Sequence, residues 1–229
     1  MTTPHKSTPP AQTVAPTRET LIRVALVLFG SKGFDGTSTR EIAAAAKANI
    51  GSIAYHFGGK EGLRIAAADH VADLIRVATE QAMNFSAAMP ASASPGPEVA
   101  RAQLATTLER MVTFIVASPE AGEVVQFVLR ELSHPTAALD RIYDGVFAPV
   151  HRRLCQIWEE ATGEPAESEG TRLAVFTLIG QIVYFRIARE AVMRRMGWSA
   201  LGQAEAAKVA AVATDNLDAM LNARKAQKS

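Results

Sequence analysis

The sequence has a single cysteine and no long apolar run, and each shortage excludes a class of protein. With Cys155 alone among 229 residues, neither an intrachain disulfide nor a CxxC metal or redox motif can form. The longest uncharged, mostly apolar stretch is the thirteen residues between Arg172 and Arg186, whereas a membrane helix needs about 20. The N-terminus also lacks the apolar core of a secretory signal. The sequence therefore predicts a cytoplasmic protein with no membrane segment.

Charge is nearly balanced over the whole chain but not along it. The sequence contains 24 Lys and Arg against 23 Asp and Glu, and 48% of its residues are apolar, which is ordinary for a globular protein. The first 60 residues, however, contain seven basic residues and only three acidic ones. Such an excess of positive charge in one segment indicates a polyanionic partner for that segment.

Proline-rich stretches divide the chain. Residues 1–16 contain four prolines among small polar residues and are predicted to form a disordered arm, because they cannot bury enough apolar surface to offset the entropy of ordering. Residues 17–62 and 63–229 are predicted to be two helical domains, and residues 87–97 a loop within the second. Ala, Leu, Val, Glu and Arg dominate the rest and strand patterns are missing, so the predicted fold class is all-α.

Nine helices are expected, and two short ones point to function. The expected segments are roughly 17–31, 38–47, 49–57, 60–87, 97–117, 119–132, 135–162, 171–196 and 199–225. Ser38 followed by Glu41 is a capping box for the second helix, and Asn49 is expected to cap the third. Two short helices joined by a tight turn, inside a basic bundle of three, are typical of a helix-turn-helix.

Two strings of residues carry a resemblance to a known family. FGSKGFDG at residues 29–36 is followed by TSTREIAAAAKANIGSIAYHFGGKEGL at residues 37–63. Together they resemble the DNA-binding region of the TetR family of one-component bacterial transcription regulators. Ile53 and Ala54 stand where that family often has Leu-Tyr, so contact at Ala54 is limited to its methyl group. The string IGQIVYFRIAREAVMRRMGW at residues 179–198 resembles the C-terminal domain of a CerR-like subgroup.

The candidate DNA-binding residues lie on the second, third and fourth helices. They are Thr39, Arg40, Ile50, Gly51, Ser52, Ala54, Tyr55, His56 and Lys60. Thr39 and Arg40 begin a helix whose free N–H groups and dipole favour phosphate. The first turn of the third helix enters the major groove in this motif, where Ser52 can bond either base type and Ile50 can touch a thymine methyl. The tyrosine, histidine and lysine are expected on phosphates, and part of the specificity is expected from DNA shape.

The larger C-terminal part is implied by the resemblance to bind a small effector. The pocket candidates combine aromatic, Met and polar side chains: Met111, Phe114, Phe127, Arg130, Tyr143, Phe147, Phe176 and Gln181. The alternative for each of them is a plain core position, because most buried aromatic residues only pack. Arg130 and Arg186 would favour an anionic effector if they point inward, and would otherwise pair with Glu131 and Glu190.

The resemblance also implies dimerisation, and the last two helices have the residues for it. The eighth helix has one apolar stripe at Leu173, Phe176, Gly180 and Tyr184 and another at Leu178, Ile182 and Phe185, so it needs two packing partners. The ninth helix offers Val209, Ala213, Leu217 and Leu221. A two-fold homodimer through these two helices is expected, with a purely intramolecular core as the alternative.

These observations predict a homodimeric repressor that binds a palindromic double-stranded DNA operator and is released by a small-molecule effector. The alternatives are a ligand-independent DNA-binding protein and a helical enzyme that uses the C-terminal cavity. No catalytic residue and no cofactor are predicted. His151 and Cys155, four residues apart, supply only two metal ligands, which is too few for a site. For Arg40 and His56 a plain solvated role stays open.

Overall fold

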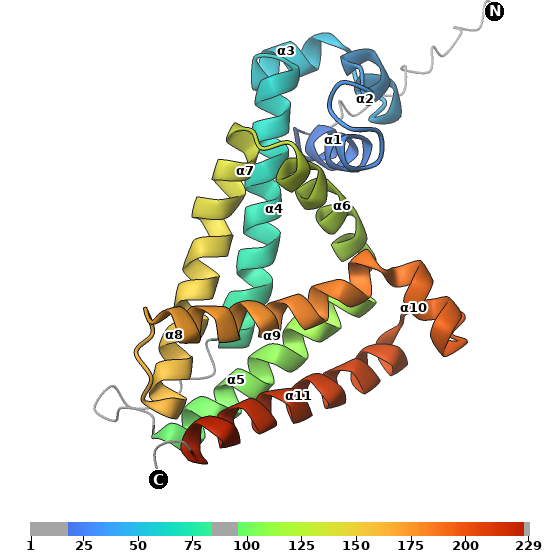
Figure 1. Ribbon diagram of the computed structural model, residues 1–229. Helices are drawn as coiled ribbons and strands as arrows, with labels where there is room; N and C mark the ends of the chain where they lie inside the picture. The colour runs from blue at the N-terminus through green and yellow to red at the C-terminus, as the bar shows by residue number, and fades with distance from the viewer. Residues whose placement is uncertain (1–17, 84–95, 227–229) are drawn as a thin grey trace, which may run out of the picture.

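The computed structural model describes residues 18–83 and 96–226, and over these residues it is all-helical with no β-strand (Figure 1). The all-α prediction is therefore confirmed. The predicted arm at residues 1–16 lies outside the described residues, as does most of the predicted loop at 87–97. None of the described helices is by itself long and apolar enough to cross a membrane. Two sharply bent pairs, Pro97–Ala117 with Pro119–Ser133 and Glu169–Ile187 with Arg189–Met196, reach that length and composition only when combined.

Four helices build the N-terminal end of the molecule: α1 (Arg18–Lys32), α2 (Thr39–Ala45), α3 (Gly51–Phe57) and α4 (Lys60–Met83). The capping box is confirmed, since the Ser38 hydroxyl accepts a hydrogen bond from the Glu41 backbone N–H at 3.1 Å. Gly58, at φ 72°, ends α3 in the left-handed conformation that glycine adopts without strain. Because α4 is long, it connects this end of the molecule to the rest (Figure 1).

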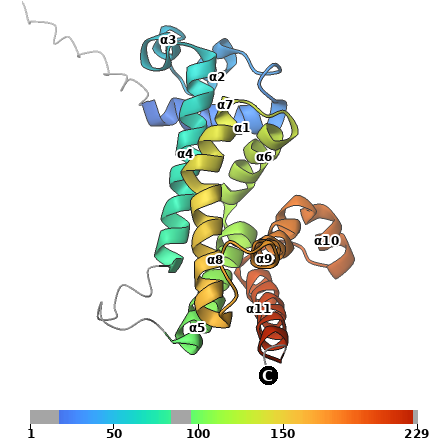
Figure 2. The same ribbon diagram turned by 60° about the vertical axis from the view of Figure 1, so that its left-hand side comes forward.

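The remaining helices form the C-terminal part. They are α5 (Pro97–Val112), α6 (Pro119–Ser133), α7 (Ala137–Ile142), α8 (Ala148–Thr162), α9 (Glu169–Ile187), α10 (Arg189–Met196) and α11 (Gln203–Ala226). A π-helical turn at Thr113–Ala117 extends α5, and another at Tyr143–Phe147 joins α7 to α8. Helix α7, the second π turn and α8 run as one rod beside α4 (Figure 2).

The expected single helix over 171–196 is wrong. It breaks at Ala188, where φ and ψ of −95° and 25° leave the helical region, and α9 and α10 meet at an angle of 78°. Neither glycine nor proline stands at the break, so the sequence gives no local signal for it. No residue of α10 is buried, and the helix projects from the body of the molecule (Figure 1).

Two hydrophobic cores hold the described residues together. The first, called here the head core, joins α1–α4 to α6, α7 and the turn after α7, and its large buried members include Leu21, Phe29, Phe127 and Ile142. The second, the body core, lies between α5, α8, α9 and α11 and surrounds Trp158. The head core thus includes side chains from both predicted domains, on either side of residue 62.

Candidate nucleic-acid interface

The turn between α2 and α3 is a compact loop closed by backbone hydrogen bonds. The Ala48 N–H donates to the Ala43 carbonyl at 2.8 Å and the Lys47 N–H to the Ala44 carbonyl at 3.1 Å, which is the bonding pattern of a Schellman motif. Lys47 takes the left-handed position of that motif, at φ 53°. As expected, the Asn49 side chain caps α3, accepting from the Gly51 N–H at 2.9 Å. The turn sets the angle between the two short helices.

The turn and caps leave one face of α3 open to solvent. Tyr55 is 85% exposed and Ile50 is 50% exposed, and Gly51, Ala54 and His56 are exposed as well. Ser52 is half-buried. On the opposite side, Ile53 is 1% exposed and belongs to the head core, and Phe57 packs against that core. Helix α3 is therefore fixed to the head core by one face, and its other face is open to solvent.

Three cations lie on the helices next to α3. Arg40 is exposed at the start of α2, beside the half-buried Thr39. The Lys60 ammonium lies 4.1 Å from the centroid of the Phe34 ring, on the turn between α1 and α2, so a favourable cation–π contact holds it there. Sequence reasoning missed Arg18, whose guanidinium lies 5.3 Å from the Phe57 ring centroid at the end of α3.

One ion pair fastens α1 to α2. The Lys32 ammonium binds the Glu41 carboxylate, and this hydrogen bond lowers the pKa of Glu41. The pair neutralises Lys32, so within the described residues Arg40 and Lys47 are the exposed cations of the helix-turn-helix that form no ion pair. Arg40 on α2 and Lys47 on the turn that follows it therefore keep their charges open to solvent.

Helix α6 attaches this unit to the rest of the molecule. Arg130, expected in the effector pocket, instead donates to the Gly30 carbonyl at 3.2 Å and the Ser31 carbonyl at 3.1 Å, at the end of α1. The two helices also touch closely, because a Cβ at Gly30 would lie 3.1 Å from the Phe127 backbone nitrogen. The pocket assignment of Arg130 is corrected for this reason.

The next residue of α6 reaches α4. Glu131 is 5% exposed and lies 3.8 Å from Arg64 Nε of α4. Its second carboxylate oxygen accepts from the Thr136 hydroxyl at 2.5 Å. The Arg64 guanidinium in turn lies 4.1 Å from the Phe34 ring centroid. Adjacent residues of α6 therefore hold the two long helices of the N-terminal unit.

The C-terminal part contains a small apolar cavity of about 20 Å³, which is room for about one water molecule. It lies between α5, α8, α9 and α11. Its lining is aliphatic side chains and one methionine: Leu104, Leu108, Met111, Leu154, Val175, Leu178, Ile179 and Leu217. Met111 is the single pocket candidate that the structure brings to this wall.

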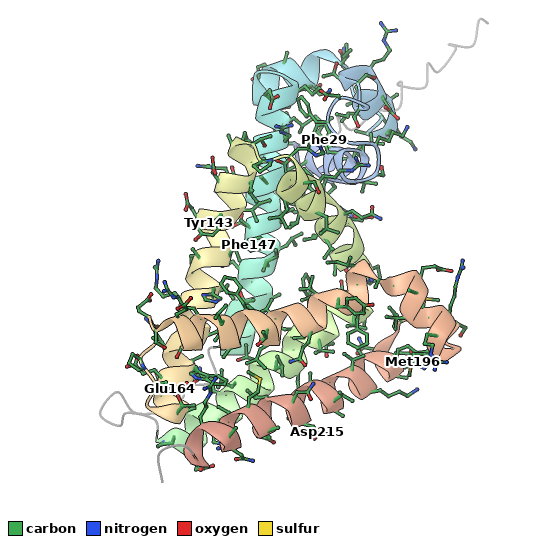
Figure 3. All side chains as sticks on the ribbon, in the orientation of Figure 1. Phe29, Tyr143, Phe147, Glu164, Met196 and Asp215 are labelled. Carbon is green, nitrogen blue, oxygen red and sulfur yellow. The ribbon has the colours of Figure 1, made fainter. Side chains whose placement is uncertain are left out.

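The other candidates lie elsewhere. Phe127 is fully buried in the head core and Phe147 packs against it. Tyr143, on the same rod as Phe147 (Figure 3), is 56% exposed, and Phe176 is 59% exposed. Phe114 is half-buried outside the lining. Phe127 and Phe147 are drawn away from the cavity because α6 and the segment after α7 pack onto the N-terminal unit. Phe176 lies on the exposed side of α9, opposite the residues of that helix that line the cavity.

The polar candidates are also engaged outside the cavity. The Gln181 side chain accepts from Asn216 Nδ2 at 2.9 Å, across the outer side of α9 and α11. Arg186 donates to the Pro119 carbonyl at 3.4 Å, and burial, followed by the nearby Arg189, lowers its pKa. Glu190 pairs with Arg194 at 2.7 Å. Arg130 and Arg186 both donate to backbone carbonyls outside the cavity. The two arginines therefore give no support to an anionic effector.

The two predicted stripes of α9 have different fates. Leu178 and Ile182 are buried in the body core, whereas the other stripe is open to solvent. Its four members, Leu173, Phe176, Gly180 and Tyr184, are all exposed, and so is Ile187 at the end of the same helix. On α11 the expected interface residues Val209, Ala213, Leu217 and Leu221 are all buried within the chain. They face the body core, and the outer face of α11 instead carries Val212, which is 59% exposed.

His151 and Cys155 do come together, with Nδ1 and Sγ 3.7 Å apart. Burial raises the pKa of the Cys155 thiol, which keeps it protonated and a poor ligand. His151 Nε2 is 3.2 Å from the Arg172 carbonyl oxygen, and its ring stacks on Phe176 with centroids 4.0 Å apart. The described residues contain no group of three side chains that could hold a metal ion.

Comparison with known proteins gives two family matches. Residues 21–67 match the model of bacterial regulatory proteins of the tetR family. Residues 100–224 match the C-terminal domain of the HTH-type transcriptional dual regulator CecR. The subgroup expected from residues 179–198 is thus confirmed, with its name corrected from CerR to CecR.

Individual relatives extend over nearly the whole chain. The HTH-type transcriptional dual regulator CecR of Shigella flexneri is 30% identical over 204 residues, which is 89% of this chain and 91% of that protein. A Pseudomonas aeruginosa PAO1 protein of known crystal structure matches with a TM-score of 0.62 at 19% identity, over 88% of this chain and 90% of that one. A TetR-family member from Streptomyces coelicolor gives 0.58 at 20% identity, over 86% and 88%. These structures share the fold.

Proposed function

The chain belongs to the TetR family of bacterial transcription regulators, and from this premise we propose that it is a homodimeric repressor released from a palindromic operator by a small-molecule effector. The observation that carries the proposal is the open face of α3, where Tyr55 and Ile50 are exposed above a buried Ile53. Within the proposal, residues 17–62 form the DNA-binding domain and residues 63–229 bind the effector and dimerise.

The proposed DNA contacts divide into positioning and reading residues. Arg40, Tyr55, His56 and Lys60 contact phosphates, and Thr39 supports them from the first turn of α2. Bases are read from the first turn of α3, with Ser52 as the one hydrogen-bonding group and Ile50, Gly51 and Ala54 making close apolar approaches. Because the readers are small, shape and deformability of the operator supply part of the specificity.

The division is tested by selecting sequences from random DNA with the purified protein. Ser52→Ala is expected to relax base preference at one symmetric pair of positions, by at most about 1–3 kcal/mol. Lys60→Ala is expected to weaken all sequences alike and to reduce the salt dependence of binding. The assignment is wrong if Lys60→Ala changes the selected sequence. The selected DNA should contain two half-sites one helical turn, about 34–36 Å, or a multiple of it apart.

The proposed dimer uses the outer faces of α9 and α11. The exposed stripe on α9 is apolar and helical in period, and a contiguous apolar face of this kind is typical of an interaction site. Phe176→Asp is expected to yield monomers by sedimentation, because a carboxylate cannot be buried unpaired. Gln181→Leu removes the acceptor of Asn216 on the same face. The variant distinguishes a role of Gln181 in the dimer interface from a role in the effector pocket. Loss of the dimer supports the interface, and a changed effector response with the dimer intact supports the pocket.

Coupling between effector and operator is proposed to run through α6. Arg186 of α9 touches the start of α6 at Pro119, and Val175, Leu178 and Ile179 of the same α9 line the cavity. The other end of α6 holds α1 and α4 through Arg130 and Glu131. An effector that moves α9 would therefore shift the reading helices without touching them, and operator and effector would change each other's affinity by one factor.

Arg130→Ala tests this coupling. The variant should retain operator binding and lose most of the effector-induced change in affinity, while Leu132→Ala, an exposed neighbour on α6, leaves both unchanged. An unchanged response in Arg130→Ala would exclude α6 as the route. In vitro transcription with and without the protein distinguishes repression from activation, a distinction needed because the Shigella relative is a dual regulator by name.

A ligand-independent regulator is the second candidate. It is supported by the cavity between α5, α8, α9 and α11, which measures about 20 Å³ and has room for about one water molecule, so an effector that binds there would have to push these helices apart. The two candidates are separated by measuring operator release against a library of small apolar and amphipathic compounds. Release by a compound that also raises the Tm supports the effector mechanism, and a complex resistant to every compound supports the second candidate.

A further inference from the structure

Lys47 has a backbone conformation that its side chain disfavours. It is the one residue other than glycine with positive φ in the described segments, at 53°. Left-handed geometry brings the Cβ of an ordinary residue close to the neighbouring carbonyl oxygen, which is why glycine is preferred at this place in a Schellman motif. The turn itself requires only the backbone, whose two hydrogen bonds a glycine would form equally well.

The Lys47 side chain contributes nothing visible to the fold. It is exposed, and within the described residues it takes part in no hydrogen bond, ion pair or ring contact. Lys47 is therefore held in a sparsely populated backbone conformation, and its side chain does not stabilise the fold. Residues of this kind are common at functional sites, so a function of the side chain is expected.

The position of Lys47 indicates that function. It lies in the turn before α3, three residues before Ile50, whose side chain is 50% exposed. Arg40 begins α2 and Lys47 follows its end, so the two unpaired cations of the helix-turn-helix stand at the two ends of one helix of seven residues. Lys32, the third cation nearby, is already neutralised by Glu41. Two like charges facing solvent on either side of a short helix suit a row of phosphates.

We propose that Lys47 is a further phosphate-binding residue, which contacts the DNA backbone beside the groove entered by α3 and works as a pair with Arg40. This inference rests on the proposed reading role of α3. It explains why a strained lysine stands where glycine would be more stable, because the charge is available to DNA only if the strain is tolerated.

Three substitutions separate charge from backbone strain. Lys47→Ala removes the charge and keeps the strain, Lys47→Arg keeps both, and Lys47→Gly removes both. The control is Arg195→Ala, which removes an exposed charge from α10, far from α3 (Figure 1). Binding is measured with a 30-base-pair duplex of mixed sequence, since non-specific affinity comes from phosphate contacts and needs no known operator.

The salt dependence of this binding gives the decisive result. Each lost phosphate contact reduces the slope of log affinity against log salt by about 0.9. The proposed dimer places two copies of α3 on the duplex, so Lys47→Ala and Lys47→Gly should each reduce this slope by about 1.8. Lys47→Arg and Arg195→Ala should leave the slope unchanged. Thermal unfolding should show Lys47→Gly as the more stable form, by about 2–4 °C in Tm, with Lys47→Ala close to wild type.

Two outcomes overturn the proposal. If Lys47→Ala has the wild-type slope and affinity, Lys47 is a tolerated strain without a DNA contact. If Lys47→Arg loses as much as Lys47→Ala, the charge is not what matters. Failure of the proposed DNA-binding function looks different, because the wild-type protein and the Arg195→Ala control would then also fail to bind the duplex.

Discussion

The head core and the body core differ in how they are closed. The head core takes α6 and α7 from the C-terminal part, and its contacts are tight enough that Gly30 and Phe127 meet at the backbone. The body core has spare room at the cavity beside Met111 and an uncovered apolar stripe on α9. The head core therefore holds its helices in close contact, whereas the body core has room to adjust. Helix α6 belongs to the head core and also touches α9 of the body core.

Phe127→Ala should give the largest effect, because it empties the centre of the contact between α6 and α1. Removing a fully buried phenylalanine costs about 3–5 kcal/mol of unfolding free energy. Urea unfolding followed by circular dichroism should show this loss, together with loss of DNA binding. Trp158→Ala is the matched change in the body core and should lower stability while the folded fraction still binds DNA. Equal loss of DNA binding per folded molecule in both variants would contradict the distinction.

Glu131→Gln should have the next largest effect. The substitution leaves the buried Arg64 without its charged partner on α6 but keeps an acceptor for the Thr136 hydroxyl. We therefore expect the free energy of unfolding to fall by about 2–3 kcal/mol, which is at or below the low end for breaking a buried ion pair. Glu61, 3.5 Å from Arg64 Nε and mostly exposed, provides the matched control as Glu61→Gln. Denaturation of both variants measures the difference. Similar stabilities would show that Glu131 does not hold α4.

Gly122→Ala should be nearly neutral for stability and informative about coupling. A Cβ there would lie 2.1 Å from a guanidinium nitrogen of Arg186, so this flexible side chain must leave the start of α6. Helix propensity favours the alanine by about 0.5–1 kcal/mol, which offsets the weak lost contact. Effector response should fall while the Tm is kept. A normal response would show that the Arg186 contact carries no signal between the two cores.

The smallest effect is expected on removing the Lys32–Glu41 ion pair of the N-terminal unit by Glu41→Gln, and it concerns how the Tm depends on pH. The pKa of Glu41 is lowered by this hydrogen bond, so its contribution to stability is present above the ordinary glutamate pKa of about 4.3. The contribution is lost as the pH falls through the lower pKa of the folded state. Between about pH 5 and pH 3 the wild-type Tm should therefore fall slightly more than that of Glu41→Gln. Parallel curves would show that the pair contributes nothing.

Local signals predicted much of the N-terminal unit, while the packing of the C-terminal part needed the structure. Ser38 and Asn49 cap where their chemistry placed them, because capping depends on residues only two or three apart. Arg130 and Phe127 fitted a pocket equally well in sequence, and their real neighbours on α1 lie about 100 residues away. The break at Ala188 and the strain at Lys47 likewise have no signature of composition, since both follow from the path the backbone takes between packed helices.

The shared head core also determines the order in which this chain can fold during synthesis. Residues 18–63 leave the ribosome well before α6, which ends at Ser133. At about 5–20 residues per second, the roughly 70 intervening residues take about 4–14 s to make. Through that interval the side of α1 that will meet Phe127 has no cover. The nascent N-terminal unit therefore exposes apolar surface until α6 has been made. A fragment that ends before α6 should aggregate under conditions in which the full chain does not.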